Sequence, residues 1–332
     1  MANIYLTEQG STLRKTGDRL IVQKDDEVLL DVQCSKIDAV LIFGNVQFTT
    51  QAVHELFEHG IEMALLTRNG KLIGQLTSPF TKNIELRIAQ FGKYHDESFR
   101  LTLSKAIIRG KLNNCLSIMK SFSGNHPEKE LSGETMFIES SAHSIDAAES
   151  IPSLLGIEGS AAKSYFSAFG KMMLGSFTFE GRRKHPSTDP VNALLSFGYT
   201  LIFNEISSLL DGLGFDPYLG YLHTVEYGRA SLANDIQEEF RPSVDRFTLY
   251  LVNNRMLGPD DFYPNAKDGS VYMKRETMKK YFAEYEKNLS REFLHPDTKE
   301  NTTLRKCFRI QAEKLAAFIK GGKDYTPFIL ET

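Results

Sequence analysis

A histidine and two acidic residues between positions 223 and 238 have the types and spacing of a metal site. His223 precedes Asp235 by twelve residues, and Asp235 precedes Glu238 by three. Residues 229–240 have helical periodicity, and side chains three apart on a helix are neighbours, so Asp235 and Glu238 are expected to point the same way. Facing carboxylates repel one another unless a cation or a proton lies between them. With a nearby imidazole they form a mixed nitrogen and oxygen set suited to a divalent metal.

Each of these residues also has an ordinary structural interpretation. A lone His223 is more often a packed or surface histidine than a ligand, and Asp235 and Glu238 could belong to a solvated helix face. Gly220 and Gly228 flank the histidine and are expected to leave the approach to it open. A ferritin-like di-iron site agrees less well with the sequence, because the paired Glu-x-x-His motifs of those bundles are absent.

Glu158 is a further acidic candidate, 65 residues before His223. Small residues follow it directly, which permits close approach of another helix or of a substrate backbone. Taken alone, Glu158 is interpreted as an acid at a helix N-terminus, complementing the macrodipole. The sequence has no P-loop, GxSxG, GxGxxG or HExxH motif, so it offers neither a nucleotide-hydrolysis site nor an activated serine or cysteine.

The composition is that of an ordinary globular protein of 332 residues, with 41% hydrophobic and 24% charged side chains and a net charge of −3. No apolar run approaches the roughly 20 residues of a membrane span. The N-terminal residues lack a basic segment followed by an apolar one, so no secretory signal is expected. Cys34, Cys115 and Cys307 are widely spaced and odd in number, which favours a reducing cytoplasm over a disulfide framework or a CxxC zinc site.

Two basic patches interrupt this balance. Residues 163–185 carry five basic side chains against Glu180, and residues 305–323 carry six against Glu313. Such patches can contact phosphates even when the net charge is negative, although a solvated face is the ordinary alternative. Within the first patch, the basic loop at 182–186 could hold phosphates by charge and by guanidinium hydrogen bonds.

The elements that must position these side chains change from strands to helices near residue 83. Short apolar runs and turn residues predict strands over 4–6, 12–15, 19–23, 28–32, 39–43, 61–66 and 71–77, and a helix over 50–59. The pair Asn69-Gly70 predicts a hairpin between the last two strands. Later periodicity predicts helices over 83–94, 98–122, 144–151, 158–173, 190–213, 230–254, 275–291 and 303–320, with a polar break at 123–133 and an irregular segment at 262–273 that is compatible with a small hairpin.

We therefore predict an α+β fold with two domains. A small β-rich N-terminal domain comprises residues 1–80, a linker with the first helix comprises 81–96, and a larger all-α catalytic domain comprises 97–332.

Four motifs, in this order, resemble one family. They are LLGIEG around Glu158, RKHPSTDPVNALLSFGY ending at Tyr199, GYLH ending at His223, and LANDIQEEFRP around Asp235 and Glu238. Over essentially its whole length, the chain resembles the CRISPR-associated integrase and endonuclease of the spacer-acquisition module, the first CRISPR-associated protein family. The resemblance implies that Glu158, His223 and Glu238 bind Mg²⁺ or Mn²⁺, and that Asp235 is a fourth catalytic residue supporting the same site.

The resemblance also implies an activity and partners. A member of this family inserts short DNA fragments into a CRISPR array by attack of a 3′-hydroxyl on a phosphodiester, and it also cleaves DNA, including branched forms. It forms a homodimer through its β domains and assembles with a small ferredoxin-like subunit. The expected DNA contacts in this chain are the basic residues Lys163, Arg182, Arg183, Lys184, Arg229 and Arg241.

Three questions stay open at the level of the sequence. His223 either ligates the metal or positions or protonates a leaving oxygen. The enzyme is either an integrase or a stand-alone, structure-selective DNA nuclease. The non-enzymatic alternative is a DNA-binding scaffold whose acidic cluster is structural.

Overall fold

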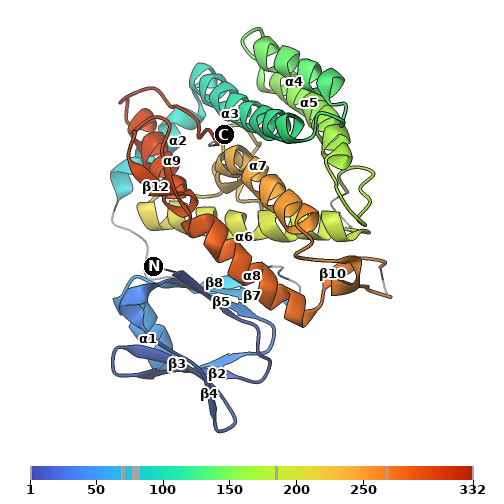
Figure 1. The fold of residues 1–332 in the computed structure, drawn as a ribbon. Helices are drawn as coiled ribbons and strands as arrows, with labels where there is room; N and C mark the ends of the chain where they lie inside the picture. Colours follow the sequence, from blue (N-terminus) through green and yellow to red (C-terminus); the bar gives the residue numbers. More distant parts are fainter. Residues whose placement is uncertain are drawn as a thin grey trace. The chain divides into compact units, whose positions relative to one another are not determined.

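The computed structural model describes residues 2–68, 70, 72–76, 83–183, 186–266 and 268–330. The chain divides into two compact units, one formed by Met1–Phe80 with Met273–Glu286 and the other by Thr81–Tyr272 with Lys287–Thr332 (Figure 1). Strands dominate the first unit and helices the second, which confirms the predicted α+β class. The second unit is mostly helical rather than all-α, because it contains short strands.

The first unit contains two four-stranded sheets. Their strands are β1 (Ala2–Leu6), β2 (Thr12–Thr16), β3 (Arg19–Lys24), β4 (Glu27–Gln33), β5 (Ile37–Phe43), β6 (Gln47–Phe48), β7 (Glu62–Leu66) and β8 (Leu72–Leu76). One sheet has the order β1-β5-β7-β8, with β8 antiparallel to three parallel strands, and the other has the order β4-β3-β2-β6. Leu20 and Val22 are buried in β3 at alternate positions, as the period of two requires. The β7–β8 hairpin was predicted, but Asn69 of its turn lies outside the described residues.

Helix α1 (Thr50–Glu58) begins where the sequence predicts and ends one residue before the predicted end. The Thr49 side chain accepts a hydrogen bond from the Ala52 amide at 3.2 Å, which caps the helix N-terminus. Gly60 follows the helix with a φ of +65°, a conformation that glycine adopts without strain. On its inner face the helix buries Ala52 and Leu56 in the core of the first unit.

Part of helix α8 (Arg275–Ser290) belongs to the first unit. The Tyr5 ring of β1 stacks on Phe282 at a centroid distance of 4.1 Å, and the Tyr5 hydroxyl donates to Glu286 Oε1 at 2.5 Å. Phe43 of β5 packs on the same phenylalanine. The sequence-based boundaries placed these residues in the helical domain, because no local pattern announces a contact between residues so far apart in the chain.

The second unit is built around helix α7. Its helices are α2 (Ile84–Tyr94), α3 (Glu97–Asn125), α4 (Ser132–Ser144), α5 (Ile151–Lys171), α6 (Pro190–Leu213), α7 (Ser231–Asn253) and α9 (Leu304–Ile319), and its short strands are β9 (Phe262–Pro264), β10 (Val271–Met273), β11 (Glu292–Leu294) and β12 (Asn301–Thr303). Helix α7 packs against both α3 and α6, and α3 also packs against α4 and α5 (Figure 1). Asp235, Glu238 and Glu239 of α7 are therefore buried acids, which need partners inside the protein.

Three predictions about the helical unit are wrong. The helix predicted at 144–151 is absent from this described segment, which connects α4 to α5, and α4 begins inside the predicted polar break at 123–133. The exposed side chains of Met136 and Phe137 obscure the apolar face of α4 in the sequence. The Ser150 side chain caps α5 by accepting from the Ser153 amide, so Glu158 lies two turns inside the helix and not at its N-terminus.

Helix α6 has the bounds that the sequence predicts. The Asp189 side chain accepts from the Asn192 amide at 2.8 Å, Pro190 opens the helix, and Gly214 ends it with a φ of +100°. The helix is long and apolar enough to cross a membrane by length and composition, and 61% of its most apolar window is buried. A core helix surrounded by other elements must be apolar all round, so this burial accounts for the composition.

Candidate active site

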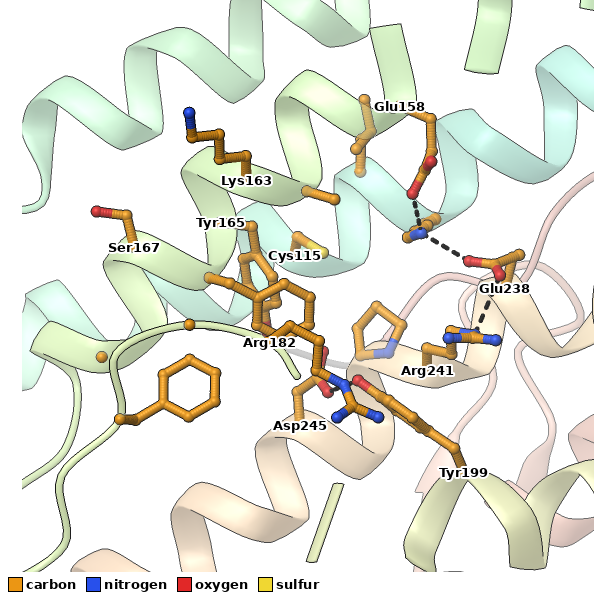
Figure 2. A pocket seen from close by; sticks show the side chains of 18 of the residues that line it. Cys115, Glu158, Lys163, Tyr165, Ser167, Arg182, Tyr199, Glu238, Arg241 and Asp245 are labelled. Atoms are coloured by element: carbon orange, nitrogen blue, oxygen red, sulfur yellow. Dashed lines mark hydrogen bonds and ion pairs between the residues drawn. The ribbon is translucent and has the colours of Figure 1, made fainter. Parts of the chain in front are cut away.

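A cavity of about 870 Å³ opens in the second unit among α3, α5, α7 and the loop before α6 (Figure 2). Its lining includes the three predicted metal ligands, Glu158, His223 and Glu238, and three of the predicted DNA contacts, Lys163, Arg182 and Arg241. The structure therefore brings together side chains from an internal turn of α5, from the loop before α7 and from α7 itself.

Lys111 of α3 joins the two glutamates. Its ammonium contacts Glu158 of α5 and lies 2.6 Å from Glu238 Oε2 of α7 (Figure 2). Burial disfavours the charged lysine, but Glu238 and Glu158 raise the pKa of Lys111 above its ordinary value. Burial likewise opposes the charge of Glu238, yet Arg241 and Lys111 lower its pKa to about 2. The pair of carboxylates is thus arranged around a positive charge.

Asp235 does not face the same partners as Glu238. Its Oδ2 accepts the backbone amides of Tyr221 and Leu222 at 2.6 and 3.0 Å, and its Oδ1 accepts the amide of His223 at 3.0 Å. The same Oδ1 lies 2.8 Å from the ring Nδ1 of His223. Asp235 is fully buried, so it shapes the loop and orients the imidazole. Because an ionised carboxylate can only accept a hydrogen bond, Nδ1 is the donor and carries the hydrogen. In the neutral ring the free lone pair therefore lies on Nε2.

Gly220 makes this loop geometry attainable. A Cβ at this position would lie 2.7 Å from the backbone carbon and the Cβ of Ser231 and 2.9 Å from Asp235 Oδ2. Gly220 is therefore packed tightly, in contrast to the open approach expected from the sequence. Gly228 has a φ of +76° and open space around it.

Two arginines line the other side of the cavity. The guanidinium of Arg241 lies 3.0 Å from Glu238 Oε1 and 4.9 Å from the centre of the Tyr199 ring. Arg182 lies 5.3 Å from the same ring, and its terminal nitrogens donate to the Arg183 carbonyl, to Asn192 and to Ser196. Arg182 therefore helps to build the loop before α6. Arg241 both holds Glu238 and faces the cavity.

The remaining basic candidates occupy different settings. Lys163 lines the cavity and is exposed, and Arg183 is exposed with a 2.9 Å ion pair to Glu180. Arg229 lies near the start of α7, 3.5 Å from Glu226. Lys184 lies outside the described residues. In the second basic patch, Arg305 pairs with Glu205 at 2.9 Å and Lys314 with Asp297 at 2.8 Å, so part of that charge is already used inside the protein.

The sequence-based reasoning missed Lys111 and the polar cluster beside it. The Tyr199 hydroxyl donates to Asp245, and burial raises the pKa of this carboxyl to about 6. Asp245 lies seven residues after Glu238, two turns along the same helix, so helical spacing was a usable signal for it. Lys111 gave no such signal, because its partners lie 47 and 127 residues away.

The site residues fit a divalent metal ion. Glu158 and Glu238 converge on the ammonium of Lys111, and carboxylate oxygens are also ligands for Mg²⁺ and Mn²⁺. The hydrogen bond from His223 Nδ1 to a carboxylate is the arrangement that orients metal-binding histidines. Glu158, Glu238 and His223 Nε2 are therefore the groups that would hold the ion.

Comparison with known proteins agrees with this fold and site. The sequence matches the family model "CRISPR associated protein Cas1" over residues 4–287. A CRISPR-associated endonuclease Cas1 from Chlorobaculum tepidum is 32% identical over 98% of this chain and 97% of its own length. A Cas4 exonuclease/Cas1 endonuclease fusion from Geobacter sulfurreducens is 31% identical over 96% of this chain, which spans 58% of that longer protein.

Solved structures share the fold. A casposase bound to an integration product superposes with a TM-score of 0.88 at 23% identity, covering 99% of this chain and 93% of the casposase chain. A chain of a Cas6-RT-Cas1–Cas2 complex gives a TM-score of 0.82 at 23% identity, covering 99% of this chain and 36% of that one.

The two-unit fold and the family model place the chain among metal-dependent nucleases. Within that class, the chain belongs to the Cas1 family of CRISPR-associated endonucleases. The family that the four sequence motifs resemble is confirmed.

Proposed function

We propose that this protein is a metal-dependent DNA integrase and endonuclease that inserts short DNA fragments into a CRISPR array. One arrangement carries the proposal. Glu158 and Glu238 converge on the Lys111 ammonium, and they lie in the same cavity as His223, whose ring is oriented by Asp235. The shared fold of a casposase bound to an integration product supports strand transfer. Cleavage of DNA, including branched forms, needs only water in place of the attacking hydroxyl.

The site would hold Mg²⁺ or Mn²⁺ through Glu158, Glu238 and His223 Nε2. When bound, such an ion would supply Lewis-acid polarisation of a phosphoryl oxygen and stabilisation of charge on the attacking and leaving oxygens. In strand transfer, a DNA 3′-oxygen forms the new bond to phosphorus and another 3′-oxygen leaves, so one phosphodiester replaces another. The attacking hydroxyl gives up a proton and the leaving oxygen takes one, which keeps the exchange balanced.

The residues around these ligands have distinct tasks in this proposal. Asp235 is a positioning residue that acts through His223, because its oxygens are engaged by the loop and the ring. Arg241 and Lys163 supply positive charge in the cavity for backbone phosphates, and Arg183 extends that charge to the exposed loop. Phosphate contacts of this kind hold DNA without reading its sequence.

The proposed partners follow from the family and from the fold. We assign double-stranded DNA fragments and the repeat array as substrates, a homodimer through the β-rich unit, and a small ferredoxin-like adaptation subunit. The similarity to a chain in a Cas1–Cas2 complex supports that last partner. The free cysteines Cys34, Cys115 and Cys307 are in keeping with a cytoplasmic location.

The test is strand transfer of a short duplex into supercoiled DNA, with Mg²⁺ or Mn²⁺, with EDTA, and with and without the small subunit. We expect joined products only with metal, and none with Glu238→Gln. Glu139→Gln, which removes an exposed carboxylate paired with Lys120, is the matched control and should retain activity. Cleavage without joining would favour the stand-alone nuclease. DNA binding without turnover in any cation would favour the scaffold.

A further inference from the structure

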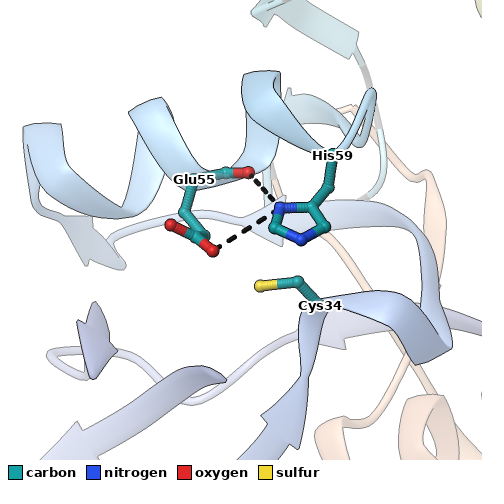
Figure 3. A group of neighbouring side chains, drawn as sticks. All are labelled: Cys34, Glu55 and His59. Atoms are coloured by element: carbon teal, nitrogen blue, oxygen red, sulfur yellow. Dashed lines mark hydrogen bonds and ion pairs between the residues drawn. The ribbon is translucent and has the colours of Figure 1, made fainter. Parts of the chain in front are cut away.

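Three metal-binding side chains of the first unit converge at the end of helix α1 (Figure 3). Cys34 begins the short 3₁₀ helix Cys34–Lys36, while Glu55 lies in α1 and His59 follows its last turn. The Cys34 sulfur, a Glu55 carboxylate oxygen and a His59 ring nitrogen all lie within 4.8 Å of one another. Glu55 and His59 are four residues apart and therefore share a helix face.

Burial and exposure divide this cluster into an inner wall and an entrance. Cys34 is 1% exposed and Glu55 is 3% exposed, whereas the His59 side chain is 37% exposed. An ion could therefore enter from the histidine side and meet a buried sulfur and a buried carboxylate. Burial also raises the pKa of the Cys34 thiol, so without an ion this side chain is a neutral SH group.

An ion pair with Lys15 of β2 accounts for only part of this arrangement. The Lys15 ammonium contacts Oε2 of Glu55, and the lysine side chain reaches out to solvent. The other carboxylate oxygen, Oε1, lies 3.5 Å from His59 Nδ1, and this nitrogen also lies 3.0 Å from the Glu55 carbonyl oxygen (Figure 3). Lys15 thus leaves one oxygen directed toward the histidine, on the side where the cysteine lies.

We infer that Cys34, Glu55 and His59 form a second metal site, which takes a zinc-class divalent ion with water in the fourth position. Thiolate, imidazole and carboxylate together select an ion of borderline softness, and three protein ligands with one open position form a recognised tetrahedral arrangement. Bonds of about 2.0–2.3 Å place tetrahedral ligand atoms roughly 3.3–3.8 Å apart, so small side-chain rotations close the site. Binding forms the metal–sulfur bond and releases the thiol proton to solvent.

The charge of the cluster suits this ion. The thiolate and the carboxylate together balance a divalent cation, and the imidazole binds as the neutral ring. The Lys15 ammonium on the other Glu55 oxygen adds one positive charge, on a side chain that reaches solvent. The ion would fasten the turn after β4 to the end of α1, and it would stabilise the first unit. The proposed active site has two carboxylates and an imidazole as ligands, so a thiolate signature separates the two sites.

The experiment is a Co²⁺ titration of the full chain under reducing conditions, followed by the near-ultraviolet charge-transfer band of thiolate-bound cobalt. We expect one thiolate-bound Co²⁺ per chain in the wild type, loss of the band in Cys34→Ser, and at least about tenfold weaker binding in His59→Gln, which alters an exposed side chain. Cys115→Ser, Cys307→Ser and Glu238→Gln should keep the band.

Three results would overturn the assignment. They are the absence of any thiolate band, a band that persists in both Cys34→Ser and His59→Gln, and a band lost only in Cys115→Ser. The last result would place cobalt in the large cavity, which Cys115 lines. Since Glu238→Gln is expected to abolish strand transfer while keeping the band, failure of this inference is distinguishable from failure of the proposed function.

Discussion

Lys111 Nζ lies 2.6 Å from Glu238 Oε2, and the same ammonium contacts Glu158. One positive charge therefore links α3, α5 and α7 at the place where a divalent ion would be held. Because the ammonium and the ion use the same two carboxylates, their binding is expected to be competitive.

Replacing Lys111 tests this competition. In Lys111→Met, Glu158 loses the ammonium that it contacts, while Glu238 keeps Arg241 as a counter-charge, so we expect a loss on the order of 3 kcal/mol in the metal-free free energy of unfolding. Mn²⁺ should then bind about tenfold more tightly and recover more stability than in the wild type, because no ammonium must be displaced. Calorimetric titration and thermal unfolding measure both effects. Lys163→Met is the control, and equal or weaker Mn²⁺ binding in Lys111→Met would refute the competition.

Asp235→Asn tests the positioning of His223. In asparagine an NH₂ group replaces one carboxylate oxygen, and this group cannot accept a hydrogen bond. The variant therefore loses the acceptor either for the Tyr221 and Leu222 amides or for the amide and ring of His223. We expect Mn²⁺ affinity and the strand-transfer rate each to fall about 10–100-fold. Asn234→Ala, one position earlier on the same helix, should change neither by more than a few-fold. Unchanged metal affinity in Asp235→Asn would show that the histidine does not depend on this carboxylate.

Gly220→Ala tests the tight turn behind the histidine. The added methyl meets the backbone of Ser231, which cannot move aside as a flexible side chain can. We expect a loss of about 1–3 kcal/mol in the free energy of unfolding, together with weaker metal binding. Gly175→Ala is the matched control, because a Cβ there meets nothing within 4 Å. Denaturant unfolding of both variants decides the matter, and equal stability would contradict the packing argument.

Glu239 should make stability depend on pH. Its oxygens accept the Tyr325 hydroxyl at 2.7 Å and the Phe328 amide at 2.7 Å, but burial raises its pKa from 4.5 to about 8. The folded state therefore holds the proton more tightly, and the resulting stability is fully present below pH 4.5 and lost as the pH rises through about 8. For one proton the slope is at most about 1.4 kcal/mol per pH unit.

Urea unfolding between pH 6.5 and 8 measures this slope, in a range above the pKa of about 6 for Asp245. Glu239→Gln is always neutral, so it should lose the slope, whatever constant offset its amide introduces. Glu313→Gln, an exposed change on α9, should keep it. The same slope in all three proteins would exclude Glu239 as its source.

Arg183→Gln tests the exposed basic loop. Its side chain is exposed, and the contact described for its guanidinium is an ion pair with Glu180, which is exposed as well. Exposed pairs contribute little to stability, so folding should be unaffected. We expect weaker binding of duplex DNA, and a plot of log affinity against log salt whose slope falls by about one. Lys120→Gln, an exposed change on α3, should leave the slope unaltered. An unaltered slope in Arg183→Gln would remove this loop from the DNA interface.

Elements with several coinciding local signals were predictable from the sequence. Helix α6 carries an aspartate cap, a proline at its first position and a glycine at its end, so its bounds were predicted to the residue. Helix α4 has exposed apolar residues and no such signals, and it was missed. The proposed ligands Glu158, His223 and Glu238 were predicted from ordered motifs, whereas Lys111 depends on contacts that only tertiary packing creates.

The return of residues 273–286 to the first unit has a consequence for how the chain folds. The chain passes between the two units three times, so no single cut separates them. A fragment ending at residue 80 would leave Tyr5 and Phe43 without the aromatic ring of Phe282. During synthesis, the strands of the first unit are made early. Their packing is completed only after residues 81–272 of the helical unit and then residues 273–286 have been synthesised.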